Sequence, residues 1–129
     1  VGIINFAYWM AKNDMTYSDP NLEMIDEYAE AWSYYLIRAS AELAEEHAPC
    51  PLAPQTQYFH GRMPNDTYKK DVDELVPHKE RMDWDKLRQM THSHGIRNST
   101  LMALMPSETS SQISNATNGI EPPRSLVYG

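Results

Sequence analysis

The sequence is poor in cysteine and in basic side chains. Among its 129 residues Cys50 is the only cysteine, which excludes an intrachain disulfide and any metal site built from several cysteines. Lys and Arg number 11 against 18 Asp and Glu, giving a formal net charge of -7. Because binding to nucleic-acid phosphates depends on clustered basic side chains, we expect no nucleic-acid partner.

Long apolar runs are also absent. The longest, Phe6 to Ala11 and Leu101 to Met105, are far short of the roughly 20 residues that a membrane-spanning helix needs. The first residues carry neither the basic stretch nor the cleavage pattern of a secretory signal. We expect no membrane association and a cytoplasmic location. The chain has no initiator methionine, and its apolar pattern is already under way at Val1, so we expect an internal piece of a longer protein.

Helical periodicity dominates the first half of the chain. Apolar residues at helical spacing predict a short helix between Ile3 and Lys12, and a long helix follows. Its apolar stripe, which we expect to be buried, consists of Ile25, Tyr28, Ala29, Trp32, Leu36, Ala39 and Leu43. Asp19 and Pro20 suit the N-cap and the first helical position, and Pro49 and Pro51 end the helix.

The second half begins with an irregular stretch. Residues 49 to 82 are rich in proline and predict a long excursion with a helical turn near Lys69 to Leu75. Asp83 is expected to cap a helix that ends at His94 and Gly95. His92 and His94 are two residues apart on that helix, so they point to different faces and predict no metal site.

The apolar run from Asn98 to Met105 predicts a buried strand that ends at Pro106. A helix is expected to start within Ser107 to Ser111 and to carry Gln112 and Ile113. The elements together predict an α/β fold, mostly helical, with one buried strand. A lone strand leaves both of its edges unpaired, which again indicates part of a larger domain.

The turn between this strand and the last helix is dense in hydroxyl groups. Its residues are Ser107, Glu108, Thr109, Ser110 and Ser111. The first amides of a helix have no intrahelical partner and favour anions, so this turn is a candidate phosphate site. The Glu108 carboxylate would repel a phosphate, and we expect it to point away. Ordinary helix capping by Ser and Thr is the alternative interpretation of the same residues.

Four stretches resemble the large subunit of class I ribonucleoside-diphosphate reductases of bacterial and phage type. They are PSETSSQISNATNGIEPPR at Pro106 to Arg124, RNSTLMALM at Arg97 to Met105, MPNDTYKKD at Met63 to Asp71, and NFAYWMAKN at Asn5 to Asn13. The resemblance covers essentially the whole chain. It implies that residues 1–129 are part of the catalytic domain, a ten-stranded α/β barrel truncated here at both ends.

The resemblance also implies an activity and its partners. The family reduces ribonucleoside diphosphates to deoxyribonucleoside diphosphates for DNA synthesis by a thiyl-radical and dithiol mechanism. Its turn holds the substrate diphosphate, a role that falls here on Ser107, Glu108, Thr109, Ser110 and Ser111. The implied partners are a metal-containing radical-generating small subunit, thioredoxin or glutaredoxin, and a second large subunit. ATP and deoxynucleotide effectors bind elsewhere.

One departure limits what this chain can do. The family needs a thiyl-radical cysteine, a reducing cysteine pair and a nearby Glu and Asn, and none of those motifs occurs here. We therefore expect no catalytic residue and no bound cofactor or metal in this segment, and no activity from the segment alone. A non-catalytic phosphate-binding or interaction module, or another radical enzyme that shares the barrel, remains as an alternative.

Overall fold

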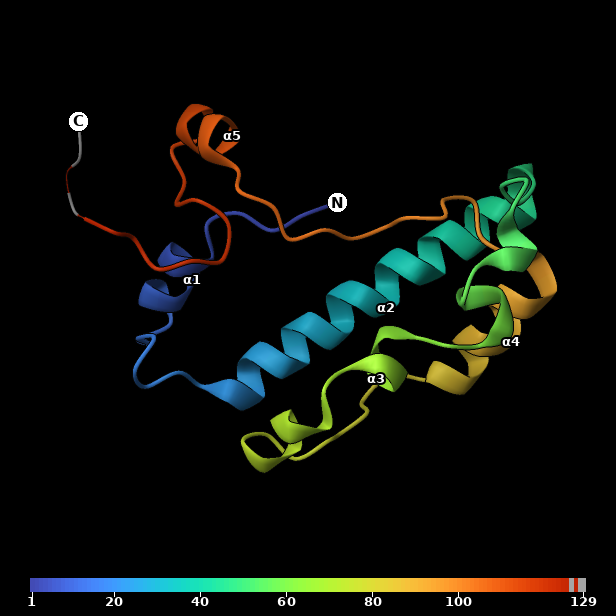
Figure 1. Ribbon diagram of the computed structural model, residues 1–129, viewed down its shortest axis with the longest axis horizontal. Coiled ribbons are helices and arrows are strands. Elements are labelled where there is room, and N and C mark those ends of the chain that lie inside the picture. Colours follow the sequence, from blue (N-terminus) through green and yellow to red (C-terminus); the bar gives the residue numbers. More distant parts are fainter. Residues whose placement is uncertain (126, 128–129) are drawn as a thin grey trace. The chain divides into compact units, whose positions relative to one another are not determined.

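The computed structural model describes residues 1–125 and 127 and divides the chain into two compact units. Unit 1 comprises Val1–Asn21 and Met102–Gly129, and unit 2 comprises Leu22–Leu101. The helices, labelled in Figure 1, are α1 (Phe6–Lys12), α2 (Leu22–His47), η1 (Ala53–Gln55), η2 (Tyr58–His60), α3 (Pro64–Thr67), η3 (Lys70–Glu74), α4 (Trp84–His94) and α5 (Glu108–Ile113). The η elements are 3-10 helices.

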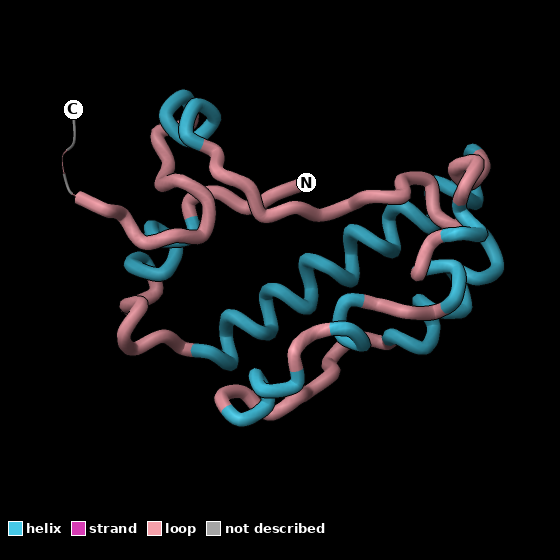
Figure 2. Tube along the Cα trace, in the orientation of Figure 1, coloured by secondary structure: helices cyan, strands magenta, loops and turns pink. Residues whose placement is uncertain are grey.

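No β-strand occurs among the described residues, as Figure 2 shows. The predicted α/β fold class, with its barrel and its buried strand at 98–105, is therefore wrong for this structure. A strand requires a ladder of backbone hydrogen bonds to a neighbour. Here the Ala103 amide donates to the Val1 carbonyl at 3.0 Å, but the flanking chain is extended without a ladder. Leu101 is buried, whereas Leu104 is 65% exposed.

In unit 2 the long helix α2 packs against α4 (Figure 1). The buried side chains of α2 are Tyr34, Ile37, Ser40, Ala41 and Ala44. Tyr34 meets the Trp84 ring edge-on, with 5.3 Å between ring centroids. The long helix is confirmed, but none of these buried residues belongs to the predicted stripe, in which Tyr28 is 60% exposed. The prediction that Tyr28 is a core residue is therefore wrong for the described chain.

The predicted ends of the helices were right for α4 and wrong for the start of α2. Asp83 caps α4, its Oδ1 accepting the Lys86 amide at 3.1 Å, and Gly95 ends the helix with φ 71°, in the left-handed region that glycine adopts freely. However, α2 begins at Leu22. Asp19 belongs to a preceding turn, in which its amide donates to Thr16 Oγ1 at 3.0 Å.

Glu30 on α2 fixes the end of the irregular excursion, within unit 2. Its carboxylate accepts the amides of Arg81 at 2.8 Å and Met82 at 3.0 Å, and the indole Nε1 of Trp84 at 2.9 Å. The Arg81 guanidinium donates to it at 3.1 Å. Burial raises the pKa of Glu30, but these hydrogen bonds outweigh it and hold the pKa below its ordinary value.

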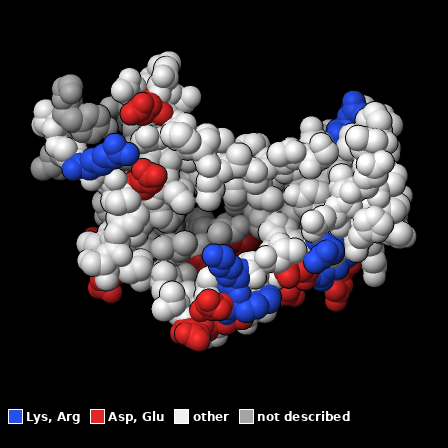
Figure 3. Space-filling view, in the orientation of Figure 1, with Lys and Arg blue, Asp and Glu red and all other residues white. Residues whose placement is uncertain are grey.

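On the face shown in Figure 3, acidic and basic side chains lie next to one another. Ion pairs join the two kinds of side chain: Arg81 pairs with Asp26 at 2.9 Å and Arg88 with Asp66 at 3.0 Å. Among the described residues, no helix combines the length and the apolar character needed to cross a membrane.

Unit 1 combines an N-terminal and a C-terminal segment of the chain. The segment before α1 runs alongside the segment before α5 (Figures 1 and 2), joined by the Ala103 to Val1 hydrogen bond. A Cβ at Gly2 would lie 2.9 Å from the Ala103 carbonyl oxygen, a backbone atom that cannot move as a side chain can, so this close approach favours glycine. Next to α1, the Tyr17 hydroxyl donates to the Ile120 carbonyl at 2.7 Å.

Candidate functional site

The hydroxyl-rich turn leads into α5, as the sequence predicts. Ser107 is the N-cap residue, with φ -124° and ψ 36°, and α5 begins at Glu108. The first helical hydrogen bond runs from the Ser111 amide to the Ser107 carbonyl at 2.8 Å. The amides of residues 108 to 110 precede that bond and belong to the set that a helix leaves without an intrahelical acceptor.

Two of the five predicted site residues have their hydroxyl groups engaged inside unit 1. Ser107 Oγ donates to Asn118 Oδ1 at 2.9 Å and accepts the Gly119 amide at 3.0 Å. Ser111 Oγ donates to the Glu108 carbonyl at 2.8 Å. Both side chains are buried, with 9% and 3% of their surface exposed.

The other three residues, Glu108, Thr109 and Ser110, are exposed. These three residues form the outer surface of the turn. The Glu108 carboxylate is the only charged group of the predicted site. The turn therefore presents hydroxyl and amide donors together with one acidic side chain.

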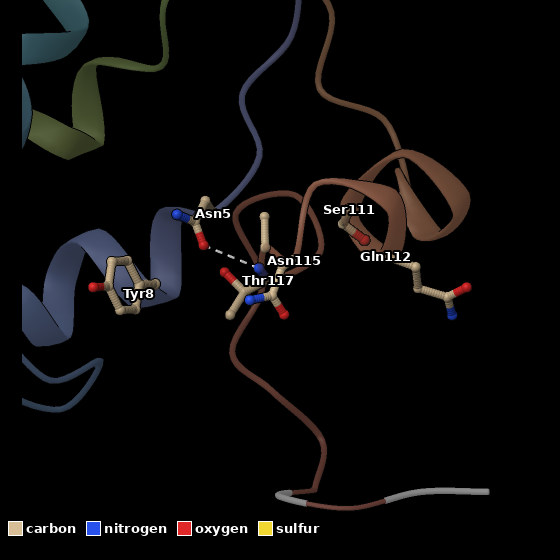
Figure 4. A pocket seen from close by; sticks show the side chains of 7 residues that line it. Asn5, Tyr8, Ser111, Gln112, Asn115 and Thr117 are labelled. Carbon is tan, nitrogen blue, oxygen red and sulfur yellow. Dashed lines mark hydrogen bonds between the residues drawn. The ribbon is translucent and has the colours of Figure 1, made fainter.

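A pocket of about 430 Å³ lies beside α5, within unit 1. Figure 4 shows Asn5 and Tyr8 on one side, and Ser111, Gln112, Asn115 and Thr117 on the other. Of the predicted site residues only Ser111 lines it. The pocket therefore shares only Ser111 with the predicted phosphate site.

Two asparagine side chains that the sequence analysis did not single out connect this region. Asn5 Oδ1 accepts the Thr117 amide at 3.0 Å (dashed in Figure 4), and the Asn5 amide donates to the Thr117 carbonyl at 2.8 Å. Asn118 Oδ1 accepts the amide of Ser107 at 2.6 Å. The sequence offered one hint, since Asn118–Gly119 is a turn dipeptide whose Asn side chain readily bonds to nearby backbone.

The remaining candidates from the sequence lie in unit 2. Cys50 is half-buried, and its amide donates to the Ile96 carbonyl at 2.9 Å. His92 Nδ1 lies 3.1 Å from the Phe59 carbonyl, and His94 Nε2 lies 3.6 Å from Glu45. The part of the chain that the structure describes contains no group of three His, Cys, Asp or Glu side chains that could hold a metal ion.

Comparison with known proteins defines the class to which this chain belongs. The model of the ribonucleotide reductase barrel domain matches residues 1–129. The chain therefore belongs to the ribonucleotide reductase barrel-domain family, as the four sequence stretches predicted.

The relatives are alpha subunits of ribonucleoside-diphosphate reductase. The chain is 56% identical to the reductase 1 subunit alpha of Salmonella typhimurium, 54% to that of Escherichia coli, and 46% to the subunit alpha of Enterobacteria phage T4. Each match covers 98% of this chain but only 17% of the relative. The chain thus corresponds to about one sixth of a reductase large subunit.

Proposed function

We propose that the protein containing this chain is a ribonucleoside-diphosphate reductase, which converts ribonucleoside diphosphates to deoxyribonucleoside diphosphates in the cytoplasm. The family match over residues 1–129 supports this proposal most directly. In the reaction the ribose 2′-hydroxyl leaves as water, and two electrons come from a dithiol that becomes a disulfide. Cys50 has no partner cysteine in this chain, so the dithiol must lie elsewhere in the subunit.

Within this enzyme, the segment would supply the turn that binds the substrate diphosphate, Ser107 to Ser111. Three features support the assignment: the PSETSS sequence, the amides of residues 108 to 110 ahead of the first helical bond, and the exposed hydroxyls of Thr109 and Ser110. Phosphate oxygens accept hydrogen bonds from all of these donors. The turn binds the terminal part of the substrate, and the nucleoside contacts other parts of the subunit.

The proposed partners follow from the family. A radical-generating, metal-containing small subunit would start the reaction, and thioredoxin or glutaredoxin would reduce the disulfide after each turnover. The large subunit would form a homodimer, with ATP and deoxynucleotide effectors bound outside this segment. The name "subunit alpha" of the relatives supports only the coarser point that such reductases are assembled from subunits.

The test is a double substitution, Thr109→Ala with Ser110→Ala, in the full-length subunit. Hydrogen bonds to a charged group contribute roughly 1.5–3 kcal/mol each, so losing both should raise the dissociation constant of a ribonucleoside diphosphate about 100-fold or more. Ser114→Ala, an exposed change at the other end of α5, is the matched control and should leave it unchanged. Effector affinity should not change in either variant. Unchanged substrate affinity in the double variant would contradict the phosphate assignment.

A further inference from the structure

Ser107 differs from its neighbours in the turn because all of its polar groups face the protein. Its amide and its hydroxyl both donate to the same atom, Asn118 Oδ1, at 2.6 and 2.9 Å. Its hydroxyl oxygen also accepts the Gly119 amide at 3.0 Å, and its carbonyl accepts the Ser111 amide. A serine hydroxyl has one proton, and in Ser107 that proton is donated to Asn118 Oδ1.

A phosphate oxygen can only accept a hydrogen bond, so to bind the Ser107 hydroxyl it would have to displace Asn118 Oδ1 as the acceptor of that proton. Doing so would leave Asn118 Oδ1 with one donor fewer at a half-buried position, which is unfavourable. Ser107 is also only 9% exposed. Ser107 is therefore suited to hold the start of α5 in place, whereas Thr109 and Ser110 are suited to contact a ligand.

The residues on either side of Asn118 are hydrogen-bonded to the start of α1. Thr117 exchanges two hydrogen bonds with Asn5, at 2.8 and 3.0 Å, and the Gly119 carbonyl accepts the Phe6 amide at 3.3 Å. A continuous set of hydrogen bonds thus runs from Asn5 through residues 117–119 to Ser107. This set fixes where the amides of residues 108 to 110 lie.

We propose that Asn118 is a positioning residue of the diphosphate site: through Ser107 it holds the first amides of α5 where the phosphate oxygens must bind. Within the proposed turn, the Ser107 hydroxyl serves this support, and Thr109 and Ser110 supply the hydroxyl contacts to substrate. The inference rests on the proposed function of the turn. The position of these amides matters for binding because a misplacement of about 1 Å is enough to weaken recognition strongly.

A double-mutant cycle tests this in the full-length subunit, with Asn118→Ala, Ser107→Ala and the two combined. Each single variant should raise the dissociation constant of a ribonucleoside diphosphate about five- to tenfold. The combined variant should be no weaker than the worse single one, because both remove the same interaction. KM should rise more than kcat falls, which separates misplaced binding from a loss of folded enzyme. Asn13→Ala, which removes an exposed asparagine bonded to the Trp9 carbonyl, is the matched control.

Asn118→Asp provides a rescue, since a carboxylate oxygen can accept both Ser107 donors but adds a negative charge near the phosphates. Relative to the unmodified enzyme, its binding defect should shrink as salt screens that charge, whereas the defect of Asn118→Ala should persist. If the increases in the dissociation constant multiply in the combined variant, the inference is overturned, because Ser107 would then act independently of Asn118. Full affinity in Asn118→Ala would also overturn it.

The two proposals fail differently. If the turn does not bind diphosphate, Thr109→Ala with Ser110→Ala leaves substrate affinity intact. If the turn binds diphosphate but Asn118 does not position it, the Thr109 and Ser110 changes weaken binding while Asn118→Ala has no effect.

Discussion

At the residue scale, Glu30 shows how one acceptor can order a segment that lacks regular structure. Its side chain, 9% exposed, accepts the amides of Arg81 and Met82, which no helix or strand would otherwise satisfy. The hydrogen bonds favour the ionised carboxylate and lower its pKa. Its contribution to stability is therefore fully present above the ordinary pKa of 4.5 and is lost as the pH falls through the lower pKa of the folded state.

We therefore expect Glu30→Gln to accelerate amide exchange at Arg81 and Met82 in the full-length subunit. The amide side chain keeps one acceptor oxygen but loses the charge that strengthens these bonds. Hydrogen-exchange mass spectrometry of peptides covering residues 80–84 measures the effect. The protection factors of the unmodified protein should drop as the pH falls below about 4.5, and those of Glu30→Gln should stay flat there. Equal protection in both proteins at neutral pH would contradict this assignment.

A second residue-scale prediction concerns Glu108, the acidic member of the turn. Its exposed carboxylate would repel a diphosphate bound at the proposed site, although solvent and salt would screen the repulsion. Glu108→Gln should therefore lower the dissociation constant of a ribonucleoside diphosphate by a few-fold at low salt, and the gain should vanish near 1 M salt. Titration calorimetry at several salt concentrations measures it, with Glu121→Gln as an acidic control beyond the turn. Weaker binding of Glu108→Gln would mean that the carboxylate itself contacts the substrate.

At the element scale, the sequence predicted helices well because their signals are local. Spacing, the Asp83 cap and Gly95 sufficed for α4, and the hydroxyl-rich turn sufficed for the start of α5. The strand at 98–105 could not be predicted in the same way. An apolar run shows that a segment prefers burial, but a strand also needs neighbours to pair with, and those are specified by distant sequence.

The same limit explains the error in α2, which carries apolar residues on two faces. The face with Tyr34, Ile37 and Ala41 packs within unit 2, whereas Tyr35 and Leu43 remain 54% and 42% exposed. Spacing alone identified one face as apolar but could not say which face the rest of unit 2 covers. For the candidate site, the turn that opens α5 was predicted from its hydroxyl groups, and its role stays a prediction. The contact between Asn118 and Ser107 was missed because it spans 11 residues.

The second apolar face of α2 gives an element-scale prediction. The chain spans 17% of its relatives, so we expect the rest of the large subunit to cover this face. Leu43→Ala in the full-length subunit should then cost roughly 2–5 kcal/mol of unfolding free energy. Glu46→Ala, on the same helix and exposed, should cost at most about 0.5 kcal/mol. Denaturant unfolding measures the free energy of unfolding of both variants. If both lose the same small amount, the second apolar face of α2 remains in contact with solvent.

At the scale of the whole molecule, the structure around Cys50 argues that this cysteine is not part of the dithiol that the proposed reductase chemistry needs. The proposed reaction consumes a dithiol, and a disulfide forms only between cysteines whose Cα atoms lie within about 7 Å. Cys50 lies between two prolines, and its amide is bonded to the Ile96 carbonyl. The neighbouring Pro49 packs closely on Gly95: a Cβ added at residue 95 would lie 2.9 Å from the Pro49 Cβ. This tight packing disfavours the movement that a redox cysteine requires.

We therefore predict that Cys50→Ser in the full-length subunit leaves turnover with a thioredoxin-type reductant within about twofold of the unmodified enzyme. Serine is close to cysteine in size, and the half-buried position can hydrate its hydroxyl, so the packing against residues 95 and 96 should persist. Steady-state formation of deoxyribonucleoside diphosphate measures this. Residues 1–129 expressed separately should form no product under the same conditions, because one cysteine cannot supply two electrons by forming an intrachain disulfide. A loss of turnover by orders of magnitude in Cys50→Ser, with substrate affinity retained, would instead assign Cys50 to the dithiol.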